Sequence, residues 1–334
     1  MEKITIAGHE LTSGKTIKDH IHVGGTEIHI PHVIICGEKP GKTVLLTAGI
    51  HNAEYVGIQA AIELSNEISP KDLSGNLIII PLANRSGFEN RTISMVYEDG
   101  KNLNRVFPGD KDGSAADRLA HLLFDAFIKN ADAYIDLHSG DGYETLIPYA
   151  YYVGEAPAHD MAKKMVDCVN TKYCVRSTCT TGGAYNIASM SGIPSVLIER
   201  GQLSLLPAEE VKADKEDVIN ILKFLGLLEG EFVTYPKTEL REFSDDAPFT
   251  GCWYPDKKVG DRFSKGDKFG EIRDYFGKTL HTAIASTDGV LIHQCSSLSI
   301  IKDGPMVTYG IFKVFANIVD DHANQEVLPW NTLI

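Results

Sequence analysis

Hydrophobic positions along the chain alternate between two kinds of pattern. Some apolar runs are short, uninterrupted and rich in branched side chains, which predicts buried strands. These runs cover residues 43–48, 76–82, 133–138 and 194–199. Between them, apolar residues recur every three or four positions, which predicts helices over 54–67, 114–128, 156–171 and 209–227. Strands that alternate with helices favour an α/β fold, with a mixed, mostly parallel sheet and helices on both faces.

The pattern changes near residues 226–238, where the helical spacing ends. Beyond this point short apolar runs are broken by glycines, as in 259–272 and 286–292, which is typical of β-hairpins. We therefore predict an α/β domain over 1–235 and a smaller all-β sandwich or half-barrel domain over 236–334. The second half resembles biotinyl and lipoyl carrier domains but lacks their attachment lysine. We expect it to cap the active site of the first domain.

Four of the histidines before residue 36 lie in alternating runs: His20, His22, His29 and His32. Alternation of polar and apolar residues predicts a hairpin or edge strands leading into the sheet. We interpret these side chains as surface imidazoles on strands and not as metal ligands.

Composition and charge narrow the function classes. The 334 residues include 45 acidic and 32 basic side chains, and the formal net charge of −13 argues against nucleic acids and anionic membranes as partners. There is no apolar run of membrane-spanning length and no leader-like start, so we expect a cytoplasmic protein. The six cysteines form no C-x-x-C pair and are expected to be reduced thiols. The sequence leaves the oligomeric state open, a homo-oligomer included.

Side chains that can bind metal occur where several predicted strands end. His51 and Glu54 follow the first buried strand, and His138 ends the third. Because ligands of open α/β sheets lie at the carboxyl ends of the strands, we expect these three side chains to converge. Two imidazoles and one carboxylate form a catalytic zinc set, with a fourth position left for water. Glu199 ends the fourth strand, is not needed as a ligand, and suits the base that takes a proton from this water.

The stretch 84–112 supplies further candidates. It is polar and glycine-rich, and a loop of this length is usually functional or disordered. Arg91 and Arg105 offer fixed positive charge for a developing oxyanion, and Arg105 alternatively offers a clamp for a substrate carboxylate. Taken singly, His138 is equally well explained as a strand-end histidine and Arg105 as a loop anchor. Their coincidence at successive strand ends favours the catalytic interpretation.

Four motifs, in this order, resemble the succinylglutamate desuccinylase/aspartoacylase family, a branch of the zinc carboxypeptidase-like hydrolases. They are H-x-x-E at 51–54, N-R-x-F-P-G at 104–109, D-x-H-S at 136–139 and G-x-P-x-x-x-x-E-x-G at 192–201. The motifs cover residues 40–205, and the glycine-rich stretch 240–320 is similar to the family's C-terminal domain. The resemblance implies one zinc ion per chain. It also implies hydrolysis of the amide that joins an acyl group to an amino acid or a related amine.

The resemblance assigns roles to the residues of these motifs. It implies His51, Glu54 and His138 as zinc ligands, with Glu199 as the base and the later proton donor. These are the same four residues that the strand ends bring forward.

Five more residues receive implied roles. Arg91 is expected to polarise the substrate carbonyl, and Asn104 and Arg105 are expected to bind the substrate. Asn102 and Asp136 are expected to orient the zinc ligands without binding the ion themselves.

The chain also departs from the family pattern. Asn52 replaces the glycine of H-G-x-E. Asn102 replaces the aspartate of D-L-N-R, which removes a charge beside a zinc ligand and is expected to lower the ligand's basicity. Arg200 follows the base and is expected to add a charge to the pocket. No second carboxylate-binding arginine is evident, which argues against N-acetylaspartate as the substrate. A tyrosine of the β-rich domain is expected to join the pocket, Tyr275 or alternatively Tyr254.

Three functions are compatible with these residues. The one that we favour is a zinc-dependent deacylase acting on a small N-acylated amino acid or acylated amine. A zinc carboxypeptidase acting on short peptides would use the same ligands with a different pocket. A non-catalytic binding protein on the same scaffold is the third.

Overall fold

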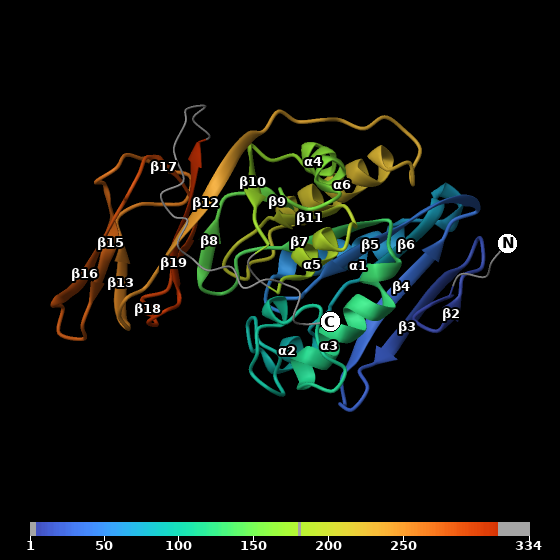
Figure 1. Cartoon of the computed structure of the whole chain (residues 1–334), viewed down its shortest axis with the longest axis horizontal. Helices are drawn as coiled ribbons and strands as arrows, with labels where there is room; N and C mark the ends of the chain where they lie inside the picture. The colour runs from blue at the N-terminus through green and yellow to red at the C-terminus, as the bar shows by residue number, and fades with distance from the viewer. Residues whose placement is uncertain (1–4, 180–181, 313–334) are drawn as a thin grey trace.

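A computed structural model describes residues 5–179 and 182–312 and confirms the predicted α/β architecture (Figure 1). Its helices are α1 (Tyr55–Glu67), α2 (Arg85–Asn90), α3 (Ala115–Ala126), α4 (His159–Asp167), α5 (Ala184–Met190) and α6 (Ala208–Phe224), with 3-10 turns η1 (Pro70–Asp72), η2 (Leu103–Arg105) and η3 (Ile128–Asn130). Its strands before residue 200 are β1 (Thr5–Ile6), β2 (His9–Glu10), β3 (Thr16–His22), β4 (His29–Cys36), β5 (Lys39–Ala48), β6 (Ser74–Ile80), β7 (Ala133–His138), β8 (Glu144–Leu146), β9 (Tyr149–Val153), β10 (Tyr173–Ser177) and β11 (Ser195–Glu199). The later strands are β12 (Thr238–Asp246), β13 (Gly251–Pro255), β14 (Arg262–Phe263), β15 (Lys268–Arg273), β16 (Thr279–Ile284), β17 (Gly289–Cys295), β18 (Ser299–Ile300) and β19 (Pro305–Phe312).

One sheet of 13 strands crosses the molecule, in the order β14-β17-β19-β12-β10-β9-β11-β7-β5-β6-β4-β3, with β8 paired to β17. At its centre β6, β5, β7 and β11 pair in parallel, whereas β9 runs antiparallel to β11. The carboxyl ends of β5, β7 and β11 therefore meet at one edge. The register places Thr47 opposite Asp136, and Glu199 opposite His138.

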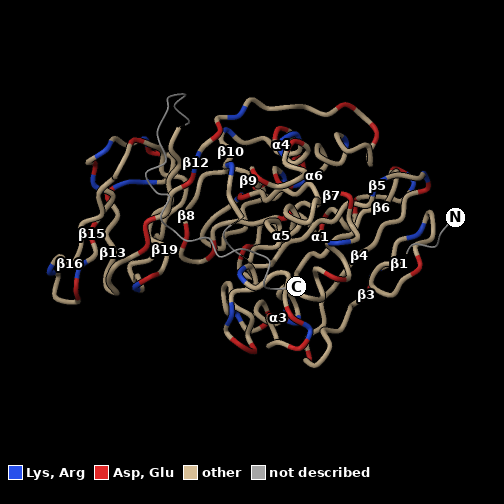
Figure 2. The backbone as a smooth tube through the Cα atoms, in the orientation of Figure 1, with Lys and Arg blue, Asp and Glu red and all other residues tan. Residues whose placement is uncertain are grey.

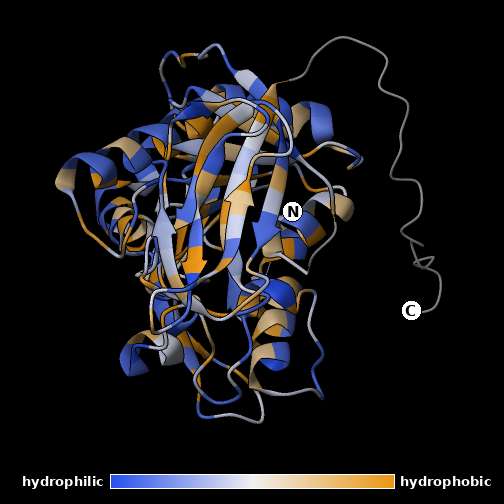
Figure 3. Ribbon diagram, turned by 90° about the vertical axis from the view of Figure 1, so that its left-hand side faces the viewer, coloured by the Kyte–Doolittle hydropathy of each residue, from blue (hydrophilic) through white to orange (hydrophobic). Residues whose placement is uncertain are grey.

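Helices cover both faces of the central sheet because successive strand side chains point to opposite faces. On one face, α1, α4 and α6 pack on alternate strand residues such as Leu46, Ile135 and Ile198. On the other face, α3 and α5 pack on the intervening residues, among them Leu45 and Tyr134. Figure 3, which views the molecule from the left-hand side of Figure 1, shows hydrophobic and hydrophilic segments mixed along the strands that face the viewer.

The region after residue 236 is rich in strands and forms its own core. A second sheet, in the order β16-β15-β13-β18, packs with β14, β17 and β19 around Trp253, Phe269 and Tyr309. The large sheet nevertheless runs across the predicted domain boundary, because β12 pairs in parallel with β10 and antiparallel with β19. The division into 1–235 and 236–334 stays a prediction, and its last segment, 313–334, lies outside the described residues.

The N-terminal histidines depart in part from the prediction. His20, His22 and His29 are exposed strand residues, but His32 on β4 is only 1% exposed. Its ring packs against Phe127, with ring centroids 5.6 Å apart, because the segment joining α3 to η3 covers this part of β4. The interpretation of His32 as a surface imidazole is therefore wrong.

The positions of acidic residues (red) and basic residues (blue) are spread along the backbone over both halves of the molecule (Figure 2). Among the described residues, no helix combines the length and the apolar content that are needed to cross a membrane.

Candidate active site

The carboxyl end of β5 delivers the first two predicted ligands. Gly49 ends the strand in the left-handed region, at φ +66°, and a Cβ atom there would lie 2.8 Å from Leu82. Glycine therefore permits the sharp turn into the segment that carries His51. Glu54 follows at the N-cap of α1 and is only 3% exposed. The turn thus holds both side chains close to the end of β7.

His51, Glu54 and His138 form one compact cluster. One potential ligand atom of each residue lies within 4.8 Å of those of the other two. The two carboxylate oxygens of Glu54 lie 2.7 Å from His51 Nδ1 and 2.9 Å from His138 Nδ1. The backbone N–H of Ser139 donates to Glu54 Oε2 at 3.0 Å. Both Nδ1 atoms therefore face the same carboxylate.

The outer nitrogens of the two imidazoles have partners of their own. His51 Nε2 lies 3.1 Å from the amide oxygen of Asn102, and His138 Nε2 lies 3.3 Å from Asp136 Oδ2. Asp136 is held in turn by the hydroxyl of Thr47, which donates to Oδ1 at 2.6 Å. Such partners fix the ring orientation and leave the Nδ1 atoms to face the centre of the cluster.

The cluster is electrostatically coupled. Burial raises the pKa of Glu54, but His138 and His51 outweigh this effect and lower the pKa to about 2. Burial lowers the pKa of His138, and Glu54 and Asp136 reverse this and raise it well above its ordinary value. Without a metal, a proton on the His138 imidazole offsets the charge of the buried Glu54 carboxylate.

Glu199 lies beside this cluster, at the end of β11. Its backbone pairs in register with that of His138. Burial, followed by repulsion from Glu54, raises the pKa of Glu199 to about 8. A carboxyl group whose pKa lies near neutrality can both accept and return a proton.

His293 is a member of the site that the sequence motifs do not indicate. It lies on β17, where it pairs with Leu146 of β8, and its Nε2 atom is 3.3 Å from Glu144 Oε2. Burial lowers the pKa of His293, but the charges of Glu144 and Glu199 outweigh this and raise it to about 9. The only sequence signal is a histidine directly after the apolar run 290–292 of β17.

The loop 84–112 contains α2 and η2 and is anchored to the turn that carries His51. Asn84 caps α2 through the N–H of Gly87, and its amide donates to the side-chain oxygen of Asn52 at 3.0 Å. Asn52, which replaces the family's glycine, is therefore a buried anchor of this loop. Arg91 ends α2 with φ +56° and has an exposed side chain. The structure does not bring Arg91 into the cluster, and its role stays a prediction.

Asn104 and Arg105 occupy different positions on η2. Asn104 is 6% exposed, and its side-chain oxygen accepts from the N–H of Ala184 at 2.9 Å, which ties the loop to α5. Arg105 has an exposed side chain that borders the cavity, and its Nη1 atom donates to the carbonyl of Asn104 at 2.9 Å.

Arg200 does not contribute to the pocket, contrary to the expectation from its position after Glu199. Successive strand residues point to opposite faces, so Arg200 faces α6. There its guanidinium lies 2.6 Å from Asp217, 3.4 Å from Asp214 and 3.5 Å from Glu210.

The two candidate tyrosines of the β-rich region lie away from the cluster. Tyr275, in the turn between β15 and β16, is 77% exposed, and the Tyr254 ring packs under Arg273 at 4.7 Å. Neither borders the cavity. The tyrosine that does border it is Tyr143, in the segment between β7 and β8.

A cavity of about 550 Å³ opens beside the cluster, between the loop 84–112 and the β-rich region. Its walls are formed by His51, Thr92, Ile93, Ser94, Met95, Asn102, Arg105, Asp141, Tyr143, Glu144, Cys295, Ser297, Ser299, Ile300, Ile301, Gly304 and Pro305. Residues from both halves of the chain therefore enclose the space next to His51. The cap function of the β-rich half stays a prediction.

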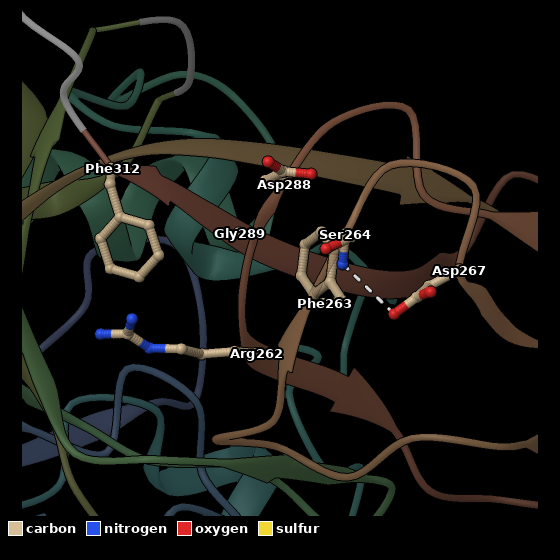
Figure 4. Close-up of a pocket in the computed structure, with 7 residues that line it drawn as sticks. All are labelled: Arg262, Phe263, Ser264, Asp267, Asp288, Gly289 and Phe312. Atoms are coloured by element: carbon tan, nitrogen blue, oxygen red, sulfur yellow. Dashed lines mark hydrogen bonds between the residues drawn. The ribbon is translucent and has the colours of Figure 1, made fainter.

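A second cavity, of about 370 Å³, lies within the β-rich region (Figure 4). Arg262 stacks over the ring of Phe312 there, 4.8 Å from its centroid, and Asp267 accepts from the N–H of Ser264. No residue of the metal-ligand cluster borders it. The chemistry of the described residues is therefore concentrated in the first cavity.

Sequence comparison decides the family. The pattern of the Succinylglutamate desuccinylase/Aspartoacylase catalytic domain matches residues 40–225, which is more than half of the chain. The chain belongs to this family. The match spans β5 to α6 and includes every residue of the candidate cluster, so the family resemblance of the motifs is confirmed.

Individual members of the family show how far the similarity extends. The N-alpha-acetyl-L-2,4-diaminobutyric acid deacetylase of Halomonas elongata is 29% identical over 234 residues, which cover 68% of this chain and 67% of the relative. A succinylglutamate desuccinylase from Silicibacter sp. TM1040 is 25% identical with a TM-score of 0.75, over 86% of this chain and 89% of that one. The product-bound ectoine utilization protein EutE (DoeB) of Ruegeria pomeroyi shares the fold at 24% identity and a TM-score of 0.79, over 89% and 95% of the two chains.

Proposed function

We propose that this chain is a zinc-dependent deacylase that hydrolyses the amide bond of a small N-acylated amino acid or related acylated amine. The observation that carries the proposal is the convergence of His51, Glu54 and His138 within 4.8 Å, next to Glu199 and a cavity of about 550 Å³. Membership of the desuccinylase/aspartoacylase family and similarity to a deacetylase support amide hydrolysis as the reaction.

The residues of the cluster fit a zinc ion. Two imidazoles and a carboxylate are the donor set of many catalytic zinc sites. Both Nδ1 atoms face Glu54, while Asn102 and Asp136 occupy the outer nitrogens. Two buried polar atoms, His138 Nε2 and Asp136 Oδ2, face each other at 3.3 Å without a well-formed hydrogen bond. A metal bound by these three side chains would supply positive charge beside the Glu54 carboxylate.

The chain's own residues then divide the work of hydrolysis. Zinc held by the cluster would act as a Lewis acid and lower the pKa of water towards about 7. Glu199 takes a proton from the attacking water and returns it to the leaving amine, because it is a carboxylate that lies beside the ligands at the end of β11 without being one of them. Arg105 borders the same cavity and supplies the positive charge for a substrate carboxylate. The side chains of Ile93 and Ile300 add apolar surface to the walls of this cavity.

The cavity volume favours small substrates. About 550 Å³ accommodates an acylated amino acid, and the β-rich wall limits longer chains. Faster cleavage of short peptides than of acylated amino acids would identify a carboxypeptidase instead.

A hydrolysis screen of zinc-loaded protein tests the proposal directly. The panel contains N-acetyl, N-formyl and N-succinyl amino acids together with short peptides, and N-alpha-acetyl-2,4-diaminobutyrate is the first compound because a relative is named for it. We expect turnover of at least one acylated amino acid and its loss in Glu199→Gln. Retained zinc without turnover across the panel would favour a binding protein.

A further inference from the structure

The wall of the active-site cavity carries charges of both signs. Arg105 is the only lysine or arginine among the described residues that border it, whereas Asp141 and Glu144 both contribute carboxylates. The two carboxylates differ in whether the protein supplies a cation to each of them, and a carboxylate without one favours a positively charged part of the substrate.

Glu144 already has a cationic partner within the protein. His293 Nε2 lies 3.3 Å from its carboxylate. Burial raises the pKa of Glu144, but the charge of His293 outweighs burial and lowers it. This carboxylate is therefore balanced by the β-rich half of the chain.

Asp141 has no comparable partner. It is 9% exposed, and its Oδ1 atom accepts only from the N–H of Tyr143 in its own turn, at 3.0 Å. Within residues 5–179 and 182–312, no ion pair joins it to a lysine, arginine or histidine. Burial, followed by repulsion from Glu144, raises its pKa to about 6. A buried carboxylate that borders a cavity and lacks a cation is costly unless a ligand supplies one.

We propose that Asp141 binds a substrate ammonium group, so that the preferred substrates are N-acylated diamino acids with a short side chain. The inference rests on the proposed deacylase function, whose site it shares. The substrate's carboxylate faces Arg105, its side-chain ammonium faces Asp141, and its methylenes contact the apolar wall of Ile93 and Ile300. Asp141 is thus a specificity residue and takes no part in the proton transfers.

Three matched compounds test this assignment by hydrolysis. N-acetyl-2,4-diaminobutyrate carries the ammonium, N-acetyl-2-aminobutyrate has the same carbon chain without it, and N-acetylaspartate carries a carboxylate instead. We expect kcat/KM for the charged diamine to exceed that for its neutral analogue by about 10- to 100-fold, as for a charged hydrogen bond. N-acetylaspartate should be the poorest of the three. Equal kcat/KM for the diamine and its neutral analogue would overturn the assignment.

Two aspartate variants separate recognition from folding. Asp141→Asn should lower the ratio of the two kcat/KM values by about tenfold or more. Asp288→Asn, which makes the same change in the wall of the second cavity, should leave the ratio unchanged. An unchanged ratio in Asp141→Asn would show that this residue does not bind the substrate's ammonium group.

A binding measurement tests the ammonium site independently of the proposed hydrolysis. Calorimetry with L-2,4-diaminobutyrate and L-2-aminobutyrate requires no turnover. Tighter binding of the diamine that is lost in Asp141→Asn supports the ammonium site even if no compound is hydrolysed, in which case only the deacylase proposal fails. Equal binding of the two compounds would refute the ammonium site even if both acetylated forms are hydrolysed.

Discussion

Two buried ionic clusters lie on opposite faces of the sheet, at the end of β11, and they differ in the kind of cation that they contain. Behind β11, Arg200 faces Asp214, Asp217 and Glu210 at 2.6–3.5 Å. A guanidinium keeps its proton at all relevant pH values, so this cluster contains a permanent cation and needs no ligand.

In front of β11, the cations are imidazoles. His51 and His138 neutralise Glu54 only while they are protonated. A metal ion can bind to a deprotonated imidazole, whereas the guanidinium of Arg200 keeps its protons and cannot bind a metal. Neighbouring residues 199 and 200 therefore belong to clusters with different tasks: the front cluster suits a metal, and the rear cluster fastens α6 to the strand that carries Glu199.

The largest expected effect concerns the front cluster. Glu199→Gln removes the proposed base but none of the ligands, so kcat/KM should fall by about 10²–10⁴-fold while zinc content is retained. Steady-state kinetics and metal analysis on the same preparation provide both values. Loss of zinc together with activity would instead identify Glu199 as a ligand.

The rear cluster should respond in stability and not in zinc content. Arg200→Met leaves Asp217 and Asp214 buried without their cation, so the free energy of unfolding should fall by about 3–5 kcal/mol. Arg85→Met is the matched control, because the Arg85–Glu89 pair is exposed and should contribute about 1 kcal/mol or less. Urea unfolding of both variants measures the difference, and similar losses would contradict the distinction between buried and exposed pairs.

His293 should make stability depend on pH in metal-free protein. Its folded pKa of about 9 lies above the ordinary value of 6.5, so its contribution is fully present below pH 6.5 and is lost as the pH rises through 9. The stability difference between wild type and His293→Gln should reach at most about 3 kcal/mol at low pH and shrink towards high pH. Urea unfolding midpoints of both proteins, measured between pH 6 and 9, test how this stability difference depends on pH. A difference that does not change with pH would show that the charge of His293 does not stabilise the fold.

The smallest expected effect concerns Asn102. Asn102→Asp gives His51 a charged partner in place of the amide oxygen at 3.1 Å, so zinc affinity should rise by about tenfold. Competition with a chelator measures the affinity. Asn102→Ala should lower the zinc affinity. Equal zinc affinities of the wild type and both variants would show that Asn102 does not contribute to the binding of zinc by His51.

Much of the α/β half could be predicted from sequence because its signals are local. The runs that form β5, β7 and β11 are short and mostly apolar, and the residues at their ends or just after them carry the chemistry. The family motifs occur at these strand ends in a fixed order along the chain, and this order identified the residues as parts of one site. Side chains alternate between the two faces along a strand, so Arg200 is predictably on the face opposite to Glu199. The expectation that Arg200 adds a charge to the pocket did not take this alternation into account.

The rest depends on contacts between distant segments. His293 meets Glu144 only because β17 pairs with β8, and no local pattern announces this pairing. The prediction of Tyr275 rests only on the expectation that a tyrosine of the β-rich half joins the pocket. Its position in an exposed turn depends on how that half folds. His32 is buried by the segment after α3, some 95 residues further along the chain.

Zinc content per chain is the most direct test of the front cluster. Wild-type protein and Glu54→Gln are purified without chelator, and their metal content is measured side by side. Wild type should contain about one zinc ion per chain and the variant almost none, because one of the three ligands has lost its charge. Absence of zinc from the wild type, or equal zinc in both proteins, would contradict the assignment of His51, Glu54 and His138 as a metal site.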